Sequence, residues 1–447
     1  MIVGYFSYDF RKHAMGFLTR GFLEHHDRAR VRPIAYSYGP NDGSDQRMRL
    51  MEAVGGATYW RDISNATGEL TARLVRQDGV HIAIDLMAHT TGSRQEVMAT
   101  QPAPVSVQYL GYPSTMGATY VNIVIVDKIV APPEHRSHFS EQLVILPQTY
   151  QSNDYPLDSA IQCPSIDVIS NEVVRRHMMG LVKKYGSDAT IKNNNNNKTT
   201  FHFVSFNKIT KLTPKAFRTF ARILRRVPRS TLTILSPKYE SVKRRLQMEL
   251  YAQGVEKSRL VFAPMIPRDE HLRRVAQSAD LFLDTFVYNA HTTATDALWS
   301  GTPVLTLEGP DFAARVATSH VNQMGLKILS TSSLREFEDL AVRIATSPKL
   351  LKGLRRRLCK NMWSSALFDT RLTTRRLEQA YEALWDVYMF DRERENDVAG
   401  TKHVVVAAGT EPRSLNERLN EILDLLGSGT LGENRTRNIL SRLKQTL

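Results

Sequence analysis

Residues 281–307 read LFLDTFVYNAHTTATDALWSGTPVLTL and contain two apolar strands separated by a helix. We predict the strands at Leu281–Leu283 and Val304–Leu307, and the helix at His291–Ser300. Gly301 ends the helix, because glycine readily takes the left-handed conformation found after helix C-termini. A strand, a helix and a strand at this spacing are typical of the repeating unit of a doubly wound α/β domain.

The same alternation continues on both sides of this stretch. Thr213 and Pro214 are typical of a helix start, with threonine as the N-cap and proline in the first turn. Further strands are predicted at residues 201–206, 232–235 and 260–262, and further helices at residues 270–278 and 312–324. We therefore predict a Rossmann-like lobe at residues 201–345.

An earlier series of apolar strands occupies residues 1–150. The predicted strands are residues 2–7, 31–36, 81–86, 105–110, 121–126 and 143–146. Strands that alternate with helices favour a parallel sheet covered on both faces. The fold class is therefore α/β, with a first Rossmann-like lobe at residues 1–150 and a second at residues 201–345.

The remaining segments read differently. Residues 151–200 hold few periodic signals and include the asparagine tract 193–197, which predicts a linker or surface insertion. Residues 346–395 read as C-terminal helices. Residues 396–447 form a tail in which Ser414–Glu417 is a capping box that begins an amphipathic helix.

Length and charge narrow the function classes. A chain of 447 residues with a formal net charge of +14 is expected to form two or three domains and to suit anionic ligands such as nucleotide phosphates. The basic clusters are spread over separate helices, and no zinc-finger spacing occurs, so nucleic-acid binding is a minor hypothesis. The motifs of P-loop NTPases, zincins and serine hydrolases are missing from the sequence.

The sequence also bears on location and cofactors. No apolar run approaches the ~18 residues of a membrane span, and Asp9, Arg11 and Lys12 interrupt the first twenty residues. Two distant cysteines offer no thiolate metal site. We expect no membrane partner, no metal and no cofactor, and a cytoplasmic or nuclear protein. The first strand begins directly after Met1, which favours a fragment or a shortened gene product.

Ligands of open α/β sheets bind at the carboxyl ends of strands, so the turn after Leu283 is the first candidate site. The N-terminus of the helix at His291 offers unpaired N–H groups and a positive dipole end to a phosphate. Thr292 and Thr293 add hydroxyl donors, and Asp296 shares their helix face, where a carboxylate could accept hydrogen bonds from ribose hydroxyls. The alternative interpretation is a threonine N-cap followed by a surface aspartate.

Other candidates follow other strands. Lys211 precedes a helix and could stabilise a departing nucleoside diphosphate, although a solvated loop lysine is the alternative. Asp9 and His13 lie four residues apart and would face one cleft on a helical turn, as a general base and a hydrogen-bonding imidazole. The alternative interpretation is a helix-capping aspartate and a surface histidine. In the turn from Leu110 to Pro113, Gly111 lets a ligand approach the backbone, unless the turn is merely tight.

Five motifs together make the chain resemble the protein O-GlcNAc transferase family, including its bacterial and plant SPINDLY-like members. They are GYFSYDF before His13, QPAPVSVQYLGYPSTMG, SFNKITKLTP, IPRDEHLRR and LDTFVYNAHTTATDALWSGTPVLT. The likeness covers residues 2–150 and 201–390. It implies a GT-B fold with a C-terminal helical extension, a donor bound between two lobes, and inverting, metal-free sugar transfer to serine or threonine hydroxyls of intracellular proteins.

The resemblance also implies roles for the matching residues. On the donor side, Lys211 would contact the diphosphate, His291, Thr292 and Thr293 would hold phosphate, Asp296 and Arg268 would lie at the ribose, and His271 would stack on uracil. In the first lobe, His13 and the turn containing Leu110, Gly111 and Pro113 would lie near the sugar and the acceptor, with Asp9 as a candidate base.

Several departures from the family keep alternatives open. The chain lacks the family's tetratricopeptide repeats and its segment upstream of the first strand. Tyr288 stands where animal members have a small residue near the N-acetyl group, and Lys208 replaces a glutamine. The favoured activity is UDP-GlcNAc:protein transfer. The alternatives are a GDP-fucose-dependent protein O-fucosyltransferase of the SPINDLY type and an inactive, basic interaction module.

Overall fold

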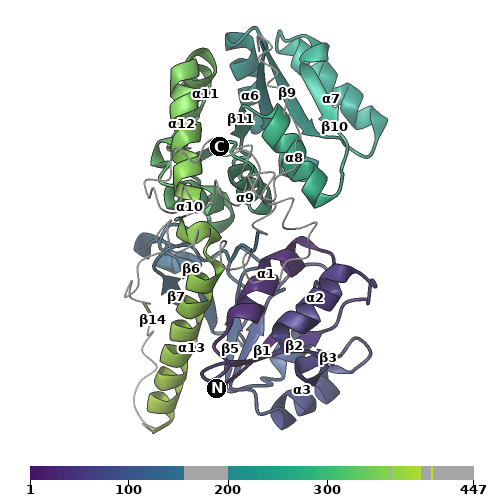
Figure 1. Cartoon of the computed structure of the whole chain (residues 1–447), viewed down its shortest axis with the longest axis vertical. Helices are drawn as coiled ribbons and strands as arrows, with labels where there is room; N and C mark the ends of the chain where they lie inside the picture. Colours follow the sequence, from purple (N-terminus) through teal and green to yellow (C-terminus); the bar gives the residue numbers. More distant parts are fainter. Residues whose placement is uncertain (156–199, 363, 394–403, 406–447) are drawn as a thin grey trace, which may run out of the picture. The chain divides into compact units, whose positions relative to one another are not determined.

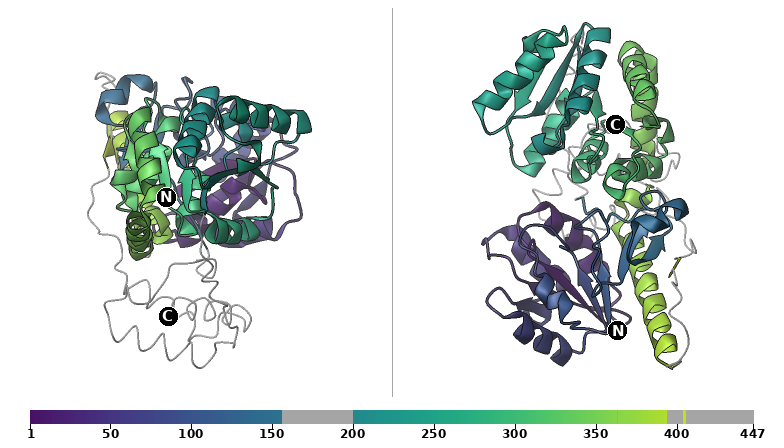
Figure 2. Two further views of the ribbon diagram at one scale, coloured as in Figure 1. Left: turned by 90° about the horizontal axis from the view of Figure 1, so that it is seen from above. Right: turned by 180° about the vertical axis from the view of Figure 1, so that it is seen from behind.

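Two parallel sheets organise the chain, and each belongs to its own folding unit (Figures 1 and 2). The computed structural model describes residues 1–155, 200–362, 364–393 and 404–405. Of the described residues, the first unit contains Met1–Asp154 and those that follow Ser365, and the second contains those from Tyr155 to Ser365. The predicted linker from residue 156 onward, the asparagine tract and the capping box in the tail lie outside the described residues.

The first sheet has the strand order β3-β2-β1-β4-β5-β6-β7-β14. Its strands are β1 Ile2–Ser7, β2 Arg32–Ser37, β3 Trp60–Asp62, β4 Ile82–Asp85, β5 Val105–Gln108, β6 Ile123–Asp127, β7 Gln142–Leu146 and β14 Val404–Val405. All neighbouring strands are parallel; Tyr5, for example, pairs with Ala35 on one side and Ile84 on the other. The chain order reverses at β1, so a topological switch point lies between β1 and β4.

Helices of the first unit cover this sheet. They are α1 Ala14–His25, α2 Asp45–Val54, α3 Gly68–Gln77, α4 Gln95–Ala99 and α13 Thr370–Glu393. In Figures 1 and 2, α13 runs beside the strands of the first unit, where it packs against α1, β5 and β7. The last helix is therefore part of the first unit, although it follows the second unit in the chain.

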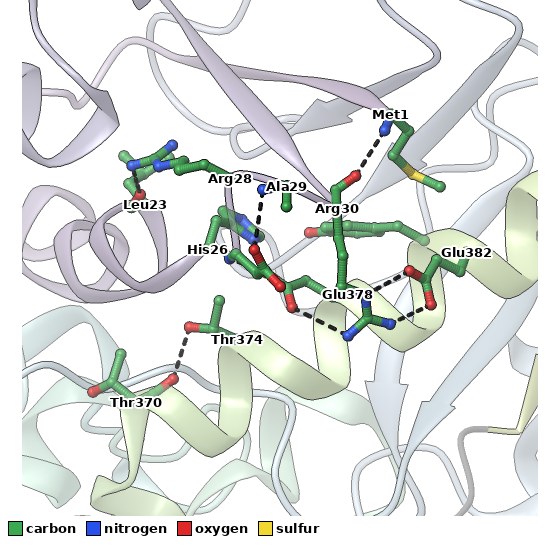
Figure 3. Close-up of polar contacts among 12 residues, drawn as sticks. Met1, Leu23, His26, Arg28, Ala29, Arg30, Thr370, Thr374, Glu378 and Glu382 are labelled. Carbon is green, nitrogen blue, oxygen red and sulfur yellow. Dashed lines mark hydrogen bonds and ion pairs between the residues drawn. The ribbon is translucent and has the colours of Figure 1, made fainter.

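A polar cluster with His26 and Glu378 at its buried centre joins α13 to the rest of the first unit (Figure 3). The ring of His26 contacts Glu378 Oε1 through Nδ1 at 2.9 Å and the Tyr5 hydroxyl through Nε2 at 2.7 Å. The backbone N–H of Asp27 donates to the same Glu378 oxygen at 2.8 Å, and Arg30 Nε donates to Glu382 Oε1 at 2.9 Å. Burial lowers the pKa of His26, and the adjacent Glu378 opposes that shift.

The second sheet has the order β10-β9-β8-β11-β12-β13. Its strands are β8 Phe201–Ser205, β9 Ser230–Leu235, β10 Leu260–Ala263, β11 Leu281–Leu283, β12 Val304–Leu307 and β13 Ser330–Thr331. Its helices are α6 Pro214–Arg226, α7 Glu240–Ala252, α8 Arg268–Ser278, α9 Thr292–Trp299, α10 Val316–Gln323, α11 Leu334–Thr346 and α12 Pro348–Met362. The chain order reverses at β8, so the switch point lies between β8 and β11.

The predicted α/β class and the two parallel sheets are confirmed. Thr213 caps α6 by accepting a hydrogen bond from Ala216 N, with Pro214 at the first position, as predicted. The predicted helix 312–324 is wrong as one element, because a 3₁₀ turn at Phe312–Ala314 is separated from α10 by Arg315. The guanidinium of Arg315 donates to Gly309 O at 3.0 Å, which ties the break to the preceding loop.

Two further differences concern strands. The predicted strand 105–110 ends at Gln108, because Leu110 takes a φ of 71° that no strand accommodates. The short strands β3, β13 and β14 were missed; β3 reads Trp-Arg-Asp and carries no apolar alternation. The contacts divide the chain after Asp154 and after Ser365, whereas the functional domain boundaries given above stay a prediction. Within the described residues, no helix is long and apolar enough to cross a membrane.

Candidate active site

The candidate site of the second unit is built on the loops that leave β8 and β11, the two strands that flank its switch point. The β8 loop carries Asn207 and Lys211 and leads into α6, and the β11 loop runs from Asp284 to the start of α9 at Thr292. Carboxyl ends of adjacent parallel strands meet at one edge of a sheet. The topology therefore brings residues about eighty positions apart in the sequence to one place.

Asp284 organises the β11 loop from inside the protein. This fully buried carboxylate accepts hydrogen bonds from Ala290 N at 2.6 Å and Thr285 N at 2.7 Å, through Oδ1, and from the Thr306 hydroxyl at 2.8 Å, through Oδ2. Burial raises the pKa of Asp284, while these hydrogen bonds and the nearby Lys211 ammonium lower it. The bonds to residues 285 and 290 close the loop on itself and set where α9 begins.

Asn207 joins the two loops. Its Nδ2 donates to the Thr285 hydroxyl at 2.9 Å, and its Oδ1 accepts from the Thr293 hydroxyl at 2.7 Å. The hydroxyl proton of Thr293 is thereby used inside the protein. Within the described part of the chain, the backbone N–H groups of Thr292 and Thr293 have no hydrogen-bond acceptor, since the first intrahelical bond to His291 O comes from Ala294 N. The α9 helix begins one residue later than predicted, with His291 as its N-cap.

Lys211, Tyr288 and His291 form one stack at the helix start. The Nζ atom of Lys211 lies 3.9 Å from the centre of the Tyr288 ring and donates to Asn289 O at 2.8 Å. The Tyr288 ring also stacks on the His291 ring, at 4.7 Å between centroids and 26° between planes. Burial lowers the pKa of Lys211 to about 8, although Asp284 raises it. A partly desolvated ammonium thus lies against the loop that leads into α9.

His291 is neutral in this arrangement. Burial, and then the Lys211 charge, lower its pKa well below the ordinary value. Its Nε2 contacts the carbonyl of Ala313 at 3.2 Å. A carbonyl can only accept, so Nε2 carries the proton and Nδ1 does not. The neutral ring therefore has no second N–H for a phosphate, and it acts here as a support for Tyr288.

The Asp296 end of the site lies one turn along α9. Asp296 is buried, and its Oδ1 accepts from Arg268 Nη2 at 3.2 Å and Nε at 3.3 Å. Arg268 is the first residue of α8, and His271 lies one turn later on that helix. The His271 ring meets Phe206 edge-on at 4.9 Å, and Arg274 contacts its Nδ1 at 2.7 Å. Burial lowers the pKa of His271, so its ring is held neutral.

All eight candidates of the second unit therefore lie on the β8 loop, the β11 loop with α9, and the start of α8. They are Lys211, Arg268, His271, Tyr288, His291, Thr292, Thr293 and Asp296. A cavity of about 1160 Å³ opens beside the β11 loop, lined by Thr213, Phe286, Val287 and others. None of the eight candidates lines that cavity, so it forms no part of the site described here.

The first unit places Asp9 and His13 together on the loop that leaves β1, at its own switch point. The predicted helical turn between them is wrong, because α1 starts only at Ala14. His13 Nδ1 nevertheless lies 3.2 Å from Asp9 Oδ2, and Arg11 Nη2 donates to Asp9 Oδ1 at 2.9 Å. The same His13 nitrogen accepts from Met15 N at 3.3 Å, so His13 is also the N-cap of α1.

The turn from Leu110 to Pro113 is tight for a packing reason. A Cβ atom on Gly111 would lie 1.8 Å from the carbonyl oxygen of Leu86, so only glycine fits there. The side chain of Gln108 fixes the turn by donating from Nε2 to Tyr112 O at 2.7 Å. The structure thus explains the glycine through contact with the β4 loop, which is the alternative interpretation given above.

The sequence analysis gave no role to three residues that hold this site: Asn207 and Asp284, which begin two of the candidate stretches, and Tyr155. A signal for Asp284 was present, since an aspartate ends the apolar run of the fourth strand in both sheets. Asp85, at the end of β4, accepts from Met87 N at 2.9 Å and Ala88 N at 3.1 Å, as Asp284 does for its own loop. Tyr155 donates to Asp296 Oδ1 at 2.6 Å across 141 positions of sequence, and no local pattern announces that contact.

The chain is similar in sequence to known proteins. The model of glycosyl transferase family 41 matches residues 1–158 and 189–377. The chain is 33% identical over 389 residues to the probable UDP-N-acetylglucosamine–peptide N-acetylglucosaminyltransferase SEC of Arabidopsis thaliana, covering 86% of this chain and 37% of that protein. It is 29% identical over 430 residues to the corresponding SPINDLY protein of Hordeum vulgare, covering 95% of this chain and 42% of that protein.

A solved structure agrees with these sequence matches. A mutant of the O-GlcNAc transferase of Thermobaculum terrenum superposes with a TM-score of 0.76 at 27% identity, covering 88% of this chain and 69% of that one. The two parallel sheets with a C-terminal helix are accordingly the GT-B architecture that the motifs predict. The chain spans about two-fifths of the length of the curated relatives named above. With the family model covering both sheets, the chain belongs to glycosyl transferase family 41.

Proposed function

We propose that this chain is the catalytic region of an inverting transferase that moves N-acetylglucosamine from UDP-GlcNAc to serine or threonine hydroxyls of proteins. The observation that carries the proposal is the grouping of a partly desolvated Lys211, the free N–H groups at the start of α9 and the Asp296 carboxylate on that same helix. A cation, a helix N-terminus and a carboxylate in this order suit a diphosphate followed by a ribose.

Lys211 and the first turn of α9 act on the diphosphate. When the bond between sugar and phosphate breaks, negative charge develops on the departing nucleoside diphosphate. The Lys211 ammonium and the N–H groups of Thr292 and Thr293 stabilise that charge, and they are already oriented before the reaction. His291 and Tyr288 keep the ammonium in place through the ring stack.

Asp296, Arg268 and His271 act on the nucleoside. Asp296 accepts hydrogen bonds from ribose hydroxyls, and Arg268 neutralises its charge from the other side. His271 offers a neutral ring for stacking on uracil, oriented by Phe206 and Arg274. The three side chains come from α8 and α9, two helices in contact with each other.

Transfer to a hydroxyl also needs a proton acceptor. We assign that role to Asp9 in the first unit, with His13 beside it and Arg11 holding its other oxygen. The Leu110–Pro113 turn is assigned to the sugar and acceptor side on the family resemblance. The acceptors are proteins of the cytoplasm or nucleus in this proposal.

A second candidate is a GDP-fucose-dependent protein O-fucosyltransferase. Tyr288 favours it, because an aromatic ring lies over Lys211 where the resemblance expects a small residue near the N-acetyl group. A sugar without an N-acetyl group would need less room there. Against it stands the sequence His291-Thr292-Thr293 with Asp296, since the resemblance gives SPINDLY-like members a threonine-rich helix start that ends in glutamate.

Thermal unfolding of the purified chain with UDP, GDP, UDP-GlcNAc and GDP-fucose tests the proposal. A ligand at 100 times its dissociation constant adds about 2.7 kcal/mol to the free energy of unfolding, enough for a readable shift in Tm. We expect shifts with both uridine compounds and none with the guanosine compounds. Shifts with guanosine compounds alone would favour O-fucosyl transfer. No shift with any of the four would favour an inactive interaction module.

A further inference from the structure

Tyr155 is the first residue of the second unit and is buried beside the site. Its hydroxyl lies 2.6 Å from Asp296 Oδ1 and 2.9 Å from the Thr295 hydroxyl. Its ring stacks on Trp299 at 5.0 Å and 28°, and the guanidinium of Arg268 lies over it at 4.4 Å. The tyrosine is therefore in contact with both helices, α8 and α9, that carry the proposed nucleoside-binding residues.

The direction of the short hydrogen bond follows from chemistry. A tyrosine hydroxyl has one proton, and an ionised carboxylate can only accept, so Tyr155 donates to Asp296. Hydrogen bonds to charged acceptors are the strong ones. Burial raises the pKa of Tyr155, and the nearby Asp296 carboxylate raises it further, so the hydroxyl keeps its proton at any working pH.

The hydrogen bonds to the Asp296 carboxylate reach one of its two oxygens. From the residues that the structure describes, Tyr155 and both Arg268 nitrogens all donate to Oδ1. The other oxygen, Oδ2, receives no hydrogen bond from them and is not one of their buried, unsatisfied atoms, so it is open to solvent. A carboxylate held by three donors at one oxygen has a fixed plane and presents the other oxygen in a fixed direction.

We propose that Tyr155 is a positioning residue that fixes Asp296 so that Oδ2 accepts a ribose hydroxyl of the nucleotide. This inference rests on the proposed function, because it concerns the same nucleotide site. The guanidinium of Arg268 also packs on the Tyr155 ring. Tyr155 therefore donates to Oδ1 itself and also helps to place the two Arg268 nitrogens that donate to the same oxygen. Without the hydroxyl, the carboxylate can rotate toward Arg268 and offer Oδ2 to its guanidinium.

The test measures nucleotide affinity after removing the Tyr155 hydroxyl from the protein, the ribose hydroxyls from the ligand, or both. Tyr155→Phe keeps the stack on Trp299 and removes only the hydroxyl. Calorimetric titrations of the whole chain use UDP and GDP, each with its 2′,3′-dideoxy analogue. We expect Tyr155→Phe to weaken the natural nucleotide about tenfold. Binding of the dideoxy analogue should stay within twofold of the wild-type chain, since it has no hydroxyl for Asp296 to accept.

A matched control exists in the first unit. Tyr36 is buried, and its hydroxyl donates to Asp78 Oδ2 at 2.7 Å, so Tyr36→Phe removes the same kind of bond away from the second unit. It should leave all four titrations unchanged. The Tm of each free variant confirms that it is folded.

Three outcomes would overturn the inference. Unchanged affinity for the natural nucleotide in Tyr155→Phe would show that the hydroxyl does not position Asp296. Equal losses for the natural and dideoxy nucleotides would give Tyr155 a purely structural role. A wild-type chain that binds no nucleotide at all would overturn the proposed function, and the inference with it, whereas the first two results leave the proposed function standing.

Discussion

Lys211 is the side chain whose environment has the most direct chemical consequence. It is removed from water, placed over the Tyr288 ring and bonded to the Asn289 carbonyl. Burial is the largest influence on its pKa and lowers it to about 8. In the free protein, Lys211 therefore begins to lose its positive charge just above neutral pH. A bound diphosphate favours the charged form and raises the pKa again.

A pH dependence of nucleotide binding follows. Above pH 8 Lys211 is largely neutral in the free protein, so binding of UDP must be accompanied by uptake of a proton. The affinity for UDP should therefore fall as pH rises, by up to about tenfold per pH unit. Calorimetry from pH 6.5 to 9.5 measures this. Lys211→Arg should flatten the profile, because a guanidinium stays charged throughout. An identical profile in both proteins would assign the titration to another group.

Asp284 gives a second prediction at this scale. Asp284→Ala leaves the N–H groups of Thr285 and Ala290 without their acceptor, which should lower the free energy of unfolding of the second unit by about 2–4 kcal/mol. Asp284→Asn should cost much less. Its amide oxygen can serve both N–H groups while its NH₂ donates to the Thr306 hydroxyl, which can rotate to accept.

Urea unfolding and UDP titration together check this pair. Both stability and UDP affinity should be lost in Asp284→Ala and mostly retained in Asp284→Asn. Asp311, an exposed aspartate of the same unit, offers the neutral control Asp311→Ala. Equal damage from the alanine and asparagine variants at position 284 would mean that the negative charge, and not the hydrogen bonds, holds the loop.

At the scale of elements, apolar strands were predictable and breaks were not. Leu281–Leu283 and Val304–Leu307 are strands at the predicted residues because both are short, mainly apolar segments in which threonine, a residue that favours strands, is the one polar member. The break at Arg315 and the left-handed Leu110 depend on contacts with other loops, which local periodicity does not contain. The candidate site was predictable where it follows strand ends, and Tyr155 was not, because its partner lies on a helix far along the chain.

The docking of α13 carries a prediction for stability against pH. The buried His26 has a lowered pKa in the folded protein, so the unfolded chain binds a proton near pH 6.5 before the folded one does. Stability is therefore fully present above about pH 6.5 and falls as pH drops below it, by up to about 1.4 kcal/mol per pH unit. Glutamine does not titrate, so the stability of His26→Gln should fall less steeply as the pH drops.

Urea unfolding of both proteins between pH 5.5 and 8 measures the difference. Only the change of that difference with pH matters, because the substitution also removes bonds to Tyr5 and Glu378 at every pH. His138→Gln, at an exposed position, is the control and should run parallel to the wild-type chain. Parallel curves for His26→Gln as well would contradict a neutral buried His26.

At the scale of the whole molecule, the same construction appears twice. Each unit has a parallel sheet whose chain order reverses at its first strand, and each carries some of its candidate residues on the elements that follow the strands at that reversal. Asp85 is the last residue of β4 and Asp284 directly follows β11, and each folds the loop after its strand. One switch point holds Asp9 and His13, and the other holds Lys211 and Asp296.

The most direct test of the account is mass spectrometry of an acceptor protein rich in serine and threonine after incubation with the chain and UDP-GlcNAc, with GDP-fucose in parallel and Lys211→Ala as the control enzyme. We expect N-acetylhexosamine on acceptor hydroxyls with UDP-GlcNAc, nothing with GDP-fucose, and at least about a hundredfold less product from Lys211→Ala. Deoxyhexose transfer from GDP-fucose, or undiminished transfer by Lys211→Ala, would contradict it.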